Sequence, residues 1–391
     1  MKLLIHDLNE SQWEKVALNY QGWEVISDDG KIKPCVGCFG CWTKNPGECV
    51  IRDGYERMGA LIHKADEIVV ISEFTYGGFS PFVKNVFDRS ISFVLPFFEI
   101  INGEMHHKSR YPEQKPITFI FTGSELSDKD KKLARSYVKA VCTNLHGKIK
   151  DIKFEEYDCS LTDEMEQKKS IDNVAEDKTQ GTILLNCSLR ADASNSKKLL
   201  DALSTKISGN TESVNLSSFI NNPVALVSKL KAAEKIVIGT PLYVDGIPSA
   251  LLRIMTLMEQ NPGSANKIIY AVTNMGFYES NQQKHLVAMI KRWCNKCGYK
   301  YGGAVAVGAG EMVGMMVNTP SAEKSPARNA ALALNKLGEA VSSSSRIADI
   351  YANAAMFPRF LYMLAANSGW PRSGKINGLR KKDLLRQIDL S

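Results

Sequence analysis

Long apolar runs are missing from this chain. The longest, residues 93–98, is far shorter than the roughly 20 residues that a helix needs to cross a bilayer. The opening MKLLIHDLNE is apolar over too short a stretch for a signal peptide, and acidic residues follow at once. We therefore expect a cytoplasmic protein that binds no membrane.

Motifs for binding nucleic acids and patterns of structural disulfides are also missing. The net charge is +7, but no helix-turn-helix, zinc-finger or aromatic RNA-binding pattern accompanies it, so no nucleic acid partner is expected. Residues 372–391 hold six basic and two acidic residues, which favours a solvated basic tail over an anion-binding one. Nine cysteines, an odd number, argue against a disulfide scaffold.

The 391 residues divide into two halves with the same order of elements. Short β-branched runs predict five strands in each half, at 2–6, 24–27, 67–72, 117–122 and 152–157, then at 183–187, 212–216, 235–239, 267–273 and 304–307. Helical patterns fill the gaps of the second half, at 196–206, 224–232, 248–260 and 281–297. Strands that alternate with helices predict a parallel sheet covered on both faces. The charged residues 161–180 are expected to link the halves.

Three loops of the second half follow predicted strands, and the carboxyl ends of parallel strands are where such sheets bind ligands. The first loop combines hydroxyl and amide side chains with one arginine before a helix, which suits a phosphate group. These residues are Ser188, Arg190, Ser194, Asn195 and Ser196. The other two loops would border a flat ring. Their residues are Pro241, Leu242, Tyr243, Val244, Asp245 and Gly246, then Thr273, Asn274, Met275 and Gly276. Flavin mononucleotide (FMN) fits better than a dinucleotide, because no G-x-G-x-x-G follows either first strand.

These motifs resemble the flavodoxin-like, NAD(P)H-dependent FMN reductases. The likeness rests on Ser188-x-Arg190, on PLY before GIP in the second half, and on CVGCFGCW and TYGG in the first half. It implies two tandem flavodoxin-like domains, each a doubly wound parallel five-stranded sheet, with a helical, basic C-terminal extension. The expected boundaries are 1–160 for the first domain, 181–345 for the FMN-binding domain and 346–391 for the extension. The tandem would form a pseudo-dimer within the chain, which could also associate as a homodimer.

The first half departs from this pattern. Its first loop contains Asp7 and Glu10, which would repel a phosphate, and no arginine corresponds to Arg190. We therefore expect only the second half to bind FMN.

Four cysteines of the first half, Cys35, Cys38, Cys41 and Cys49, are spaced C-x2-C-x2-C-x7-C. They resemble the motif with which iron–sulfur flavoproteins hold a [4Fe-4S] cluster. Reductases without a cluster carry a similar segment that includes Trp42, Pro46 and Gly47, and four thiolates also suit zinc. The sequence favours the metal-free interpretation over iron–sulfur, and iron–sulfur over zinc.

The resemblance predicts a flavin-dependent oxidoreductase. It would pass reducing equivalents from NAD(P)H through FMN to a small-molecule acceptor such as a quinone, flavin, azo or nitro compound. No catalytic acid or base is required, so none is named. Two alternatives remain, an electron carrier with a [4Fe-4S] cluster on the four cysteines and a flavin-binding module without catalysis.

Overall fold

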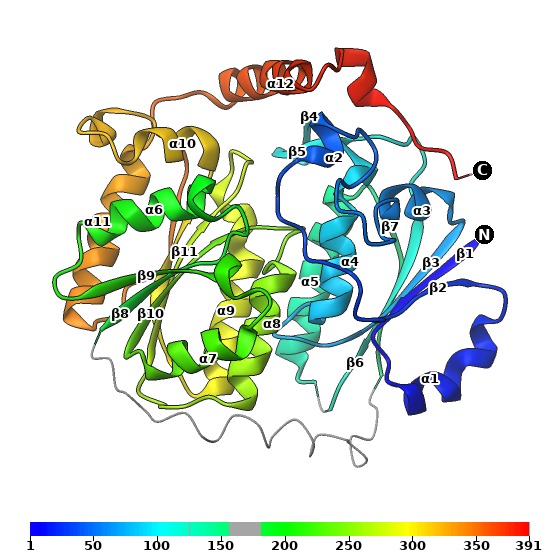
Figure 1. Cartoon of the computed structure of the whole chain (residues 1–391), viewed down its shortest axis with the longest axis horizontal. Helices are drawn as coiled ribbons and strands as arrows, with labels where there is room; N and C mark the ends of the chain where they lie inside the picture. The colour runs from blue at the N-terminus through cyan, green and yellow to red at the C-terminus, as the bar shows by residue number, and fades with distance from the viewer. Residues whose placement is uncertain (125, 156–180, 391) are drawn as a thin grey trace. The chain divides into compact units, whose positions relative to one another are not determined.

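The computed structural model describes residues 1–124, 126–155 and 181–390, which divide into two compact units (Figure 1). Unit 1 comprises Met1–Cys159 together with Phe360–Ser391, and unit 2 comprises Ser160–Arg359. The predicted extension from residue 346 is thus divided, because residues 346–359 belong to unit 2 and the remainder to unit 1. The predicted linker, 161–180, lies outside the described residues.

A five-stranded parallel sheet forms the centre of unit 1 (Figure 1). Its strands are β1 (Lys2–His6), β2 (Glu24–Ile26), β3 (Glu67–Glu73), β6 (Pro116–Thr122) and β7 (Lys148–Glu155). They lie in the order β2-β1-β3-β6-β7. Counted within the sheet this is 2-1-3-4-5, the flavodoxin-like doubly wound order. The prediction of this fold class is confirmed.

Helices cover both faces of this sheet. They are α1 (Glu10–Val16), α3 (Met58–Lys64), α4 (Pro81–Arg89) and α5 (Asp128–Asn144). Successive side chains of a strand point to opposite faces. On one face Leu4 packs in a cluster with Trp13 of α1, and on the other Ile5 lies near Ile62 of α3 and Phe87 of α4.

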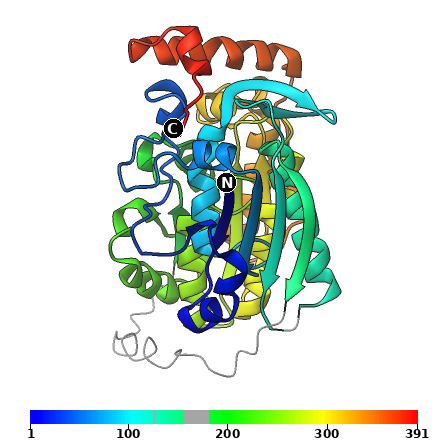
Figure 2. The ribbon, with the colours of Figure 1, turned by 90° about the vertical axis from the view of Figure 1, so that its right-hand side faces the viewer.

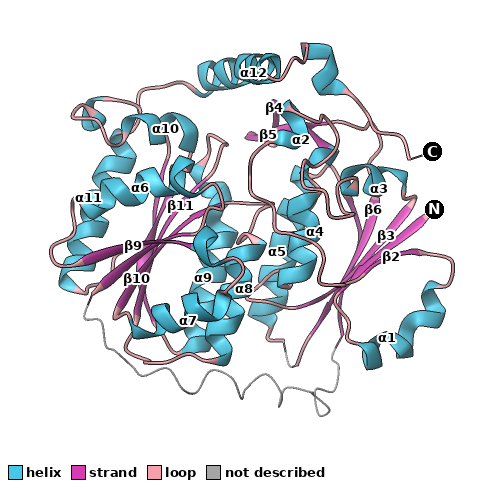
Figure 3. Cartoon of the chain, in the orientation of Figure 1, coloured by secondary structure: helices cyan, strands magenta, loops and turns pink. Residues whose placement is uncertain are grey.

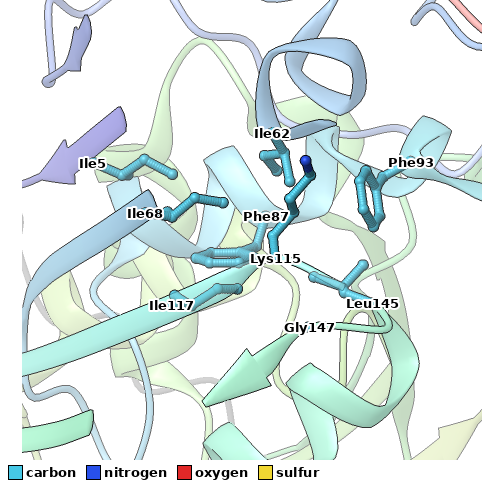
Figure 4. A pocket seen from close by; sticks show the side chains of 9 residues that line it. All are labelled: Ile5, Ile62, Ile68, Phe87, Phe93, Lys115, Ile117, Leu145 and Gly147. Atoms are coloured by element: carbon cyan, nitrogen blue, oxygen red, sulfur yellow. The ribbon is translucent and has the colours of Figure 1, made fainter. Parts of the chain in front are cut away.

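Figure 4 shows a small pocket on this second face of the unit 1 sheet. Its lining consists of Ile5, Ile62, Ile68, Phe87, Phe93, Lys115, Ile117, Leu145 and Gly147. The pocket holds about 10 Å³, which is at most the room that one water molecule needs. Lys115 is the one charged residue of the lining, and its ammonium group binds Glu113 at 3.0 Å. The pocket is a gap in core packing and lacks the convergent polar groups of a ligand site.

An antiparallel hairpin of β4 (Val94–Ile101) and β5 (Glu104–Ser109) was not expected from the sequence. In Figure 2 it is the cyan ribbon beyond the end of the unit 1 sheet. The C-terminal residues pack against it, because Leu384 is fully buried in a cluster with Leu95 and Phe97. This C-terminal segment contains α12 (Arg359–Ile376) and a short 3-10 helix (Lys381–Leu385), and the cysteine loop contributes α2 (Gly40–Thr43).

Unit 2 repeats the architecture with one strand more (Figure 3). Its strands are β8 (Thr182–Asn186), β9 (Thr211–Asn215), β10 (Lys235–Pro241), β11 (Ile268–Asn274), β12 (Lys300–Val307) and β13 (Ile350–Ala352). The order β9-β8-β10-β11-β12-β13 is again flavodoxin-like, and every pairing is parallel. The short sixth strand β13 extends the predicted five and lies inside the predicted extension.

The helices of unit 2 cover both faces of its sheet. They are α6 (Asn195–Ser204), α7 (Pro223–Ala232), α8 (Ser249–Gln260), α9 (Lys284–Cys297), α10 (Gly310–Met316) and α11 (Arg328–Ser343). Helices α6 and α11 contact each other and the strands, and α8 contacts both α7 and α9. Within the described part of the chain, no helix is long and apolar enough to span a membrane.

Candidate functional site

The carboxyl ends of β8, β10 and β11 carry the three loops that the sequence predicts for FMN. Strand β8 lies between β9 and β10, so the strand order reverses its direction there. In open α/β sheets such a switch point is the usual position of a ligand. The topology therefore brings the predicted loops to one edge of the unit 2 sheet.

The loop after β8 is held together by its own hydroxyl groups. Ser194 caps α6, since its Oγ accepts a hydrogen bond from the Lys197 amide at 3.1 Å. The Ser196 hydroxyl accepts one from Asn274 Nδ2 at 2.7 Å, which joins the first loop to the third. Ser188 Oγ accepts a weaker one from the Arg190 amide at 3.4 Å. Three of the predicted phosphate ligands, Ser188, Ser194 and Ser196, thus form hydrogen bonds that shape the loop.

Arg190 is the one cation among the predicted FMN residues. Its side chain is exposed, and none of the described residues hydrogen-bonds to its guanidinium group. A guanidinium group presents donors in a planar fork that matches phosphate oxygens. The Arg190 guanidinium group is therefore available to bind a phosphate, because it would not have to break a hydrogen bond to any described residue.

Helix α10, which was not among the predicted site residues, lies against the start of α6. A Cβ atom at Gly314 would come within 2.7 Å of Asn195 Oδ1, and one at Gly310 within 3.0 Å of the Met275 carbonyl. Glycine at both positions therefore allows α10 to approach two of the three loops. In the sequence, the signal that could have revealed this contact is the pair of glycines four residues apart.

The second loop makes a tight turn with strained backbone. Tyr243 and Gly246 form an antiparallel bridge around Val244 and Asp245, whose φ angles are 39° and 60°. A β-branched residue such as valine is an outlier at positive φ, and such strain clusters at functional sites. The Leu242 amide donates to the Asn274 carbonyl at 2.8 Å and holds this turn against the third loop.

The third loop contains the features that bear most directly on FMN. Thr273 is fully buried, and its Oγ1 has no hydrogen-bond partner among the described residues. A buried polar atom without a partner is rare and costs free energy. Gly276 is exposed, and a Cβ there would find no atom within 4 Å. Together with Arg190, these residues fit a ligand that has both an anionic group and hydrogen-bonding atoms.

The corresponding edge of the unit 1 sheet carries an acidic side chain where unit 2 carries a basic one. The Asp7 carboxylate follows β1 and accepts the Glu73 amide at 2.9 and 3.1 Å. Burial raises the pKa of Asp7, although hydrogen bonds from Ser80, Glu73 and Ser72 oppose the rise. Asp7 therefore accepts the backbone amide at the end of β3. The absence of a phosphate site from the first half stays a prediction.

The cysteine loop of unit 1 is fixed to the C-terminal end of α4. The Arg89 guanidinium donates to both carboxylate oxygens of Asp53, at 2.6 and 2.9 Å, and to the Lys33 carbonyl at 2.7 Å. Burial would raise the pKa of Asp53, but the Arg89 hydrogen bonds outweigh it and the pKa lies below its ordinary value. Helix α4 begins beside Ser72 at the carboxyl end of β3, so Arg89 and the cysteine loop lie at its opposite end from Asp7.

The C-terminal segment of unit 1 covers this loop. Asn377 Nδ2 donates to the Thr43 carbonyl at 3.0 Å, and Ile388 packs so closely on Gly47 that a Cβ there would come within 2.6 Å of its Cγ1. The buried Arg110 guanidinium donates to the carbonyls of Leu384 and Arg386. The basic residues 380–382 are all exposed, so the segment is an apolar cover with charge facing outward.

The four predicted metal ligands differ in exposure. Cys38 is exposed, Cys35 is half-buried, and Cys41 and Cys49 are buried. Burial, together with Asp88, raises the pKa of Cys35 to about 12, and burial holds the pKa of Cys41 well above its ordinary value. Apart from residues 125, 156–180 and 391, the chain contains no group of three or more His, Cys, Asp or Glu that could hold a metal ion. The iron–sulfur alternative therefore stays a prediction from the spacing of the cysteines.

No family model and no curated protein matches the chain. Among solved structures, the chain is similar to an azoreductase from Bacillus anthracis, at 16% identity over 40% of this chain and 100% of that one, with a TM-score of 0.29. An FMN-dependent NADH-azoreductase from the same species, solved with FMN, gives 17% identity over 42% and 100%, with a TM-score of 0.29. A flavodiiron core from Synechocystis gives 10% identity over 76% and 80%, with a TM-score of 0.31. At these values the likenesses carry no argument about the chemistry of this chain.

Proposed function

We propose that the protein is a flavin-dependent oxidoreductase whose unit 2 holds FMN. It would take reducing equivalents from NAD(P)H and pass them to a small acceptor such as a quinone, flavin, azo or nitro compound. The observation that carries the proposal is the edge of the unit 2 sheet, where the Arg190 guanidinium group has no hydrogen bond to a described residue and Thr273 Oγ1 has no partner among them. Both groups can donate hydrogen bonds, and FMN offers acceptors for both in its phosphate and its ring system.

The residues of the edge divide into two roles under this proposal. Arg190 and Ser188 would bind the phosphate, together with backbone amides at the start of α6. The strained turn Tyr243–Gly246 and residues 273–276 would border the ring and exclude water from it. FMN, when bound, supplies the transfer of hydride and electrons, and the protein supplies position and electrostatics.

FMN binding by the full chain tests the first part of the proposal. The Arg190→Ala variant loses a hydrogen bond to a charged group, which contributes about 1.5–3 kcal/mol, so the Kd for FMN should rise about 10- to 150-fold. Arg346→Ala is the matched control, because Arg346 is also exposed but precedes β13 at the opposite edge of the sheet. Equal Kd values for both variants would contradict the assignment.

Turnover tests the second part. Oxidation of NADH and of NADPH is followed anaerobically with quinone, azo, nitro and free-flavin acceptors. We expect turnover with at least one acceptor, and the same Arg190→Ala variant should lose it in parallel with FMN. FMN binding without turnover under any of these conditions would instead support a flavin-binding module. An absorbance spectrum of protein purified without oxygen would reveal a [4Fe-4S] cluster, which no observation on the described residues favours.

A further inference from the structure

Helix α12 has apolar side chains on the face that points to solvent. Every fourth residue from Phe360 to Ile376 is exposed, and residues at this spacing are neighbours on a helix surface. Three members of this row, Phe360, Leu364 and Ile376, are 59%, 58% and 86% exposed, and Leu361 beside them is also exposed. The outward face of α12 is therefore apolar toward both ends of the helix.

The opposite face of α12 is already packed against unit 1. The Phe98 amide of the β4–β5 hairpin donates to Asn367 Oδ1 at 2.7 Å. The Trp370 ring meets Phe39 and Trp42 edge-on, with centroid distances of 5.5 and 5.4 Å. Figures 1 and 2 both show α12 on the outside of this hairpin. A helix that is apolar on all sides is normally buried, so we expect the outward face to have a partner of its own.

Basic residues follow this apolar face in the same segment. Arg380 pairs with Asp383 at 3.4 Å, and the other basic side chains of the segment form no ion pair with a described residue. Residues 360–390 contain only two acidic residues, so their net charge is +4. All six basic residues are exposed, namely Arg372, Lys375, Arg380, Lys381, Lys382 and Arg386.

We propose that α12 and the basic residues after it bind the surface of an anionic lipid bilayer. A bilayer offers hydrocarbon to apolar side chains and anionic headgroups to lysine and arginine, and helices that lie in its surface bind through both. In a symmetric dimer formed by this face, two segments of charge +4 would meet and repel each other. A nucleic acid would match the charge, but its phosphate backbone would leave Leu364 and Ile376 without apolar contacts.

This proposal departs from two expectations based on the sequence, that the protein binds no membrane and that its basic tail is only solvated. The first rested on the lack of a spanning helix and of a signal peptide, and binding at the surface needs neither. The sequence does not reveal that Phe360 and Leu364 are exposed, because this depends on which face of α12 packs on the hairpin. The surface is independent of the proposed FMN site, since it uses residues of unit 1 only.

Sedimentation of the full chain with lipid vesicles tests the partner. Vesicles of phosphatidylcholine alone are compared with vesicles that also contain about 30% phosphatidylglycerol, which supplies the anionic charge. We expect binding to the anionic vesicles to be at least about tenfold tighter at low ionic strength, and salt to reduce this difference by screening the charges. Equal binding to both kinds of vesicle, or no binding to either, would overturn the proposal.

A double variant, Lys381→Gln with Lys382→Gln, tests the basic residues. Each basic residue near an anionic surface strengthens binding about fivefold, so this variant should bind anionic vesicles about 25-fold more weakly. The control, Lys129→Gln with Lys132→Gln, removes two exposed lysines from α5 of the same unit and should bind as the parent protein does. Equal losses in the two double variants would mean that only the net charge matters, which contradicts the assignment to this segment.

Leu364→Ser tests the apolar face. A leucine side chain that enters hydrocarbon strengthens binding by about tenfold or more, so this variant should bind the anionic vesicles about tenfold more weakly. Leu18→Ser is the control, because Leu18 is exposed in unit 1 but lies outside the segment. If the two leucine variants bound equally well, α12 would not be the contact.

Sedimentation velocity without lipid separates a bilayer from a second copy. The parent protein and Leu364→Ser should have the same oligomeric state. A dimer that is lost in Leu364→Ser would show that another copy of the chain covers this face, and would overturn the proposal. FMN content, measured on the same samples, should be equal in all variants, so a failure of the flavin proposal would be seen separately.

Discussion

The two units share a strand order and a tight turn but differ in charge at the carboxyl end of the first strand. In unit 1 the half-buried Asp7 carboxylate accepts the Glu73 amide, and in unit 2 Arg190 has a guanidinium group with no hydrogen bond to a described residue. The turn after the third strand has positive φ at both central positions in each unit, Tyr76 and Gly77 in one and Val244 and Asp245 in the other. The two units therefore share their strand order and this turn but differ in the charged side chains at the carboxyl edge of the sheet.

This difference shows how one fold can carry separate roles. In unit 1 the Asp7 carboxylate accepts a backbone amide at the switch point, and we expect it to repel anions there. A free arginine and an unpartnered threonine leave the other edge ready for a ligand. Unit 1 in turn has the cysteine loop, which unit 2 lacks, and a buried ion pair that fixes it.

The largest expected effect comes from breaking that ion pair. Arg89→Met would leave Asp53 buried without its main partner and should lower the free energy of unfolding by about 3–5 kcal/mol. The exposed pair of Lys296 and Glu259 in unit 2 is the comparison, and Lys296→Met should cost about 0–1 kcal/mol. Urea unfolding of the full chain measures both. Similar losses of unfolding free energy for the two variants would show that the ion pair of Arg89 and Asp53 does not anchor the cysteine loop.

Acid should destabilise both units through histidines whose pKa is lowered by burial, and His6 of unit 1 and His285 of unit 2 are a matched pair among them. Burial lowers the pKa of His6 and of His285 to about 4, from an ordinary value of 6.5. Between these values the unfolded chain binds a proton that the folded chain refuses. Stability is therefore unaffected above pH 6.5 and falls as the pH drops toward 4, by up to roughly 3 kcal/mol per histidine.

Asparagine substitutions at these two positions test the pH dependence. His6→Asn and His285→Asn should each flatten the loss of stability between pH 7 and pH 4.5, as measured by urea unfolding at the two pH values. An asparagine oxygen at position 6 can still accept the Leu8 amide, which now binds His6 Nδ1 at 3.2 Å. If the pH profile of either variant matched that of the parent protein, its histidine would not be the titrating group.

Substitutions in the turn that both units share should change stability in opposite directions. At Gly77 φ is 113° and a Cβ would lie 2.3 Å from Leu133 Cδ2, so Gly77→Ala should destabilise by about 1–3 kcal/mol. Val244→Gly relieves a β-branched residue at φ 39° and should stabilise by about 1 kcal/mol. Thermal unfolding of both variants measures the effects. Destabilisation by Val244→Gly would show that the valine side chain outweighs the strain of its backbone.

Most strands could be predicted from the sequence. Parallel strands buried on both faces are near-continuous apolar runs, as Ile68–Ile71 within β3 illustrates, and these runs are unambiguous when helices separate them. The hairpin was missed because Pro96 interrupts β4, and a proline within a run argues against a strand. Strand β13 has only three residues, which is too short to show an alternating pattern.

The candidate site could be predicted in part. Loops after known strands meet at one edge, so the grouping of Ser196 with Asn274 follows from topology. Topology does not specify which hydrogen bond each hydroxyl group makes. Ser194, for example, caps a helix as well as lining the loop. The contact between α10 and α6, like the burial of Leu384 in unit 1, depends on residues far apart in sequence and has no local pattern.

The number of FMN molecules bound per chain tests the central claim most directly. Equilibrium titration of the full chain, followed by quantification of the flavin released on denaturation, should give one FMN per chain. Asp7→Asn should leave this number at one, and Arg190→Ala should reduce it toward zero at FMN concentrations that saturate the parent protein. Two FMN molecules per chain, or full occupancy in Arg190→Ala, would contradict the assignment of the flavin to unit 2 alone.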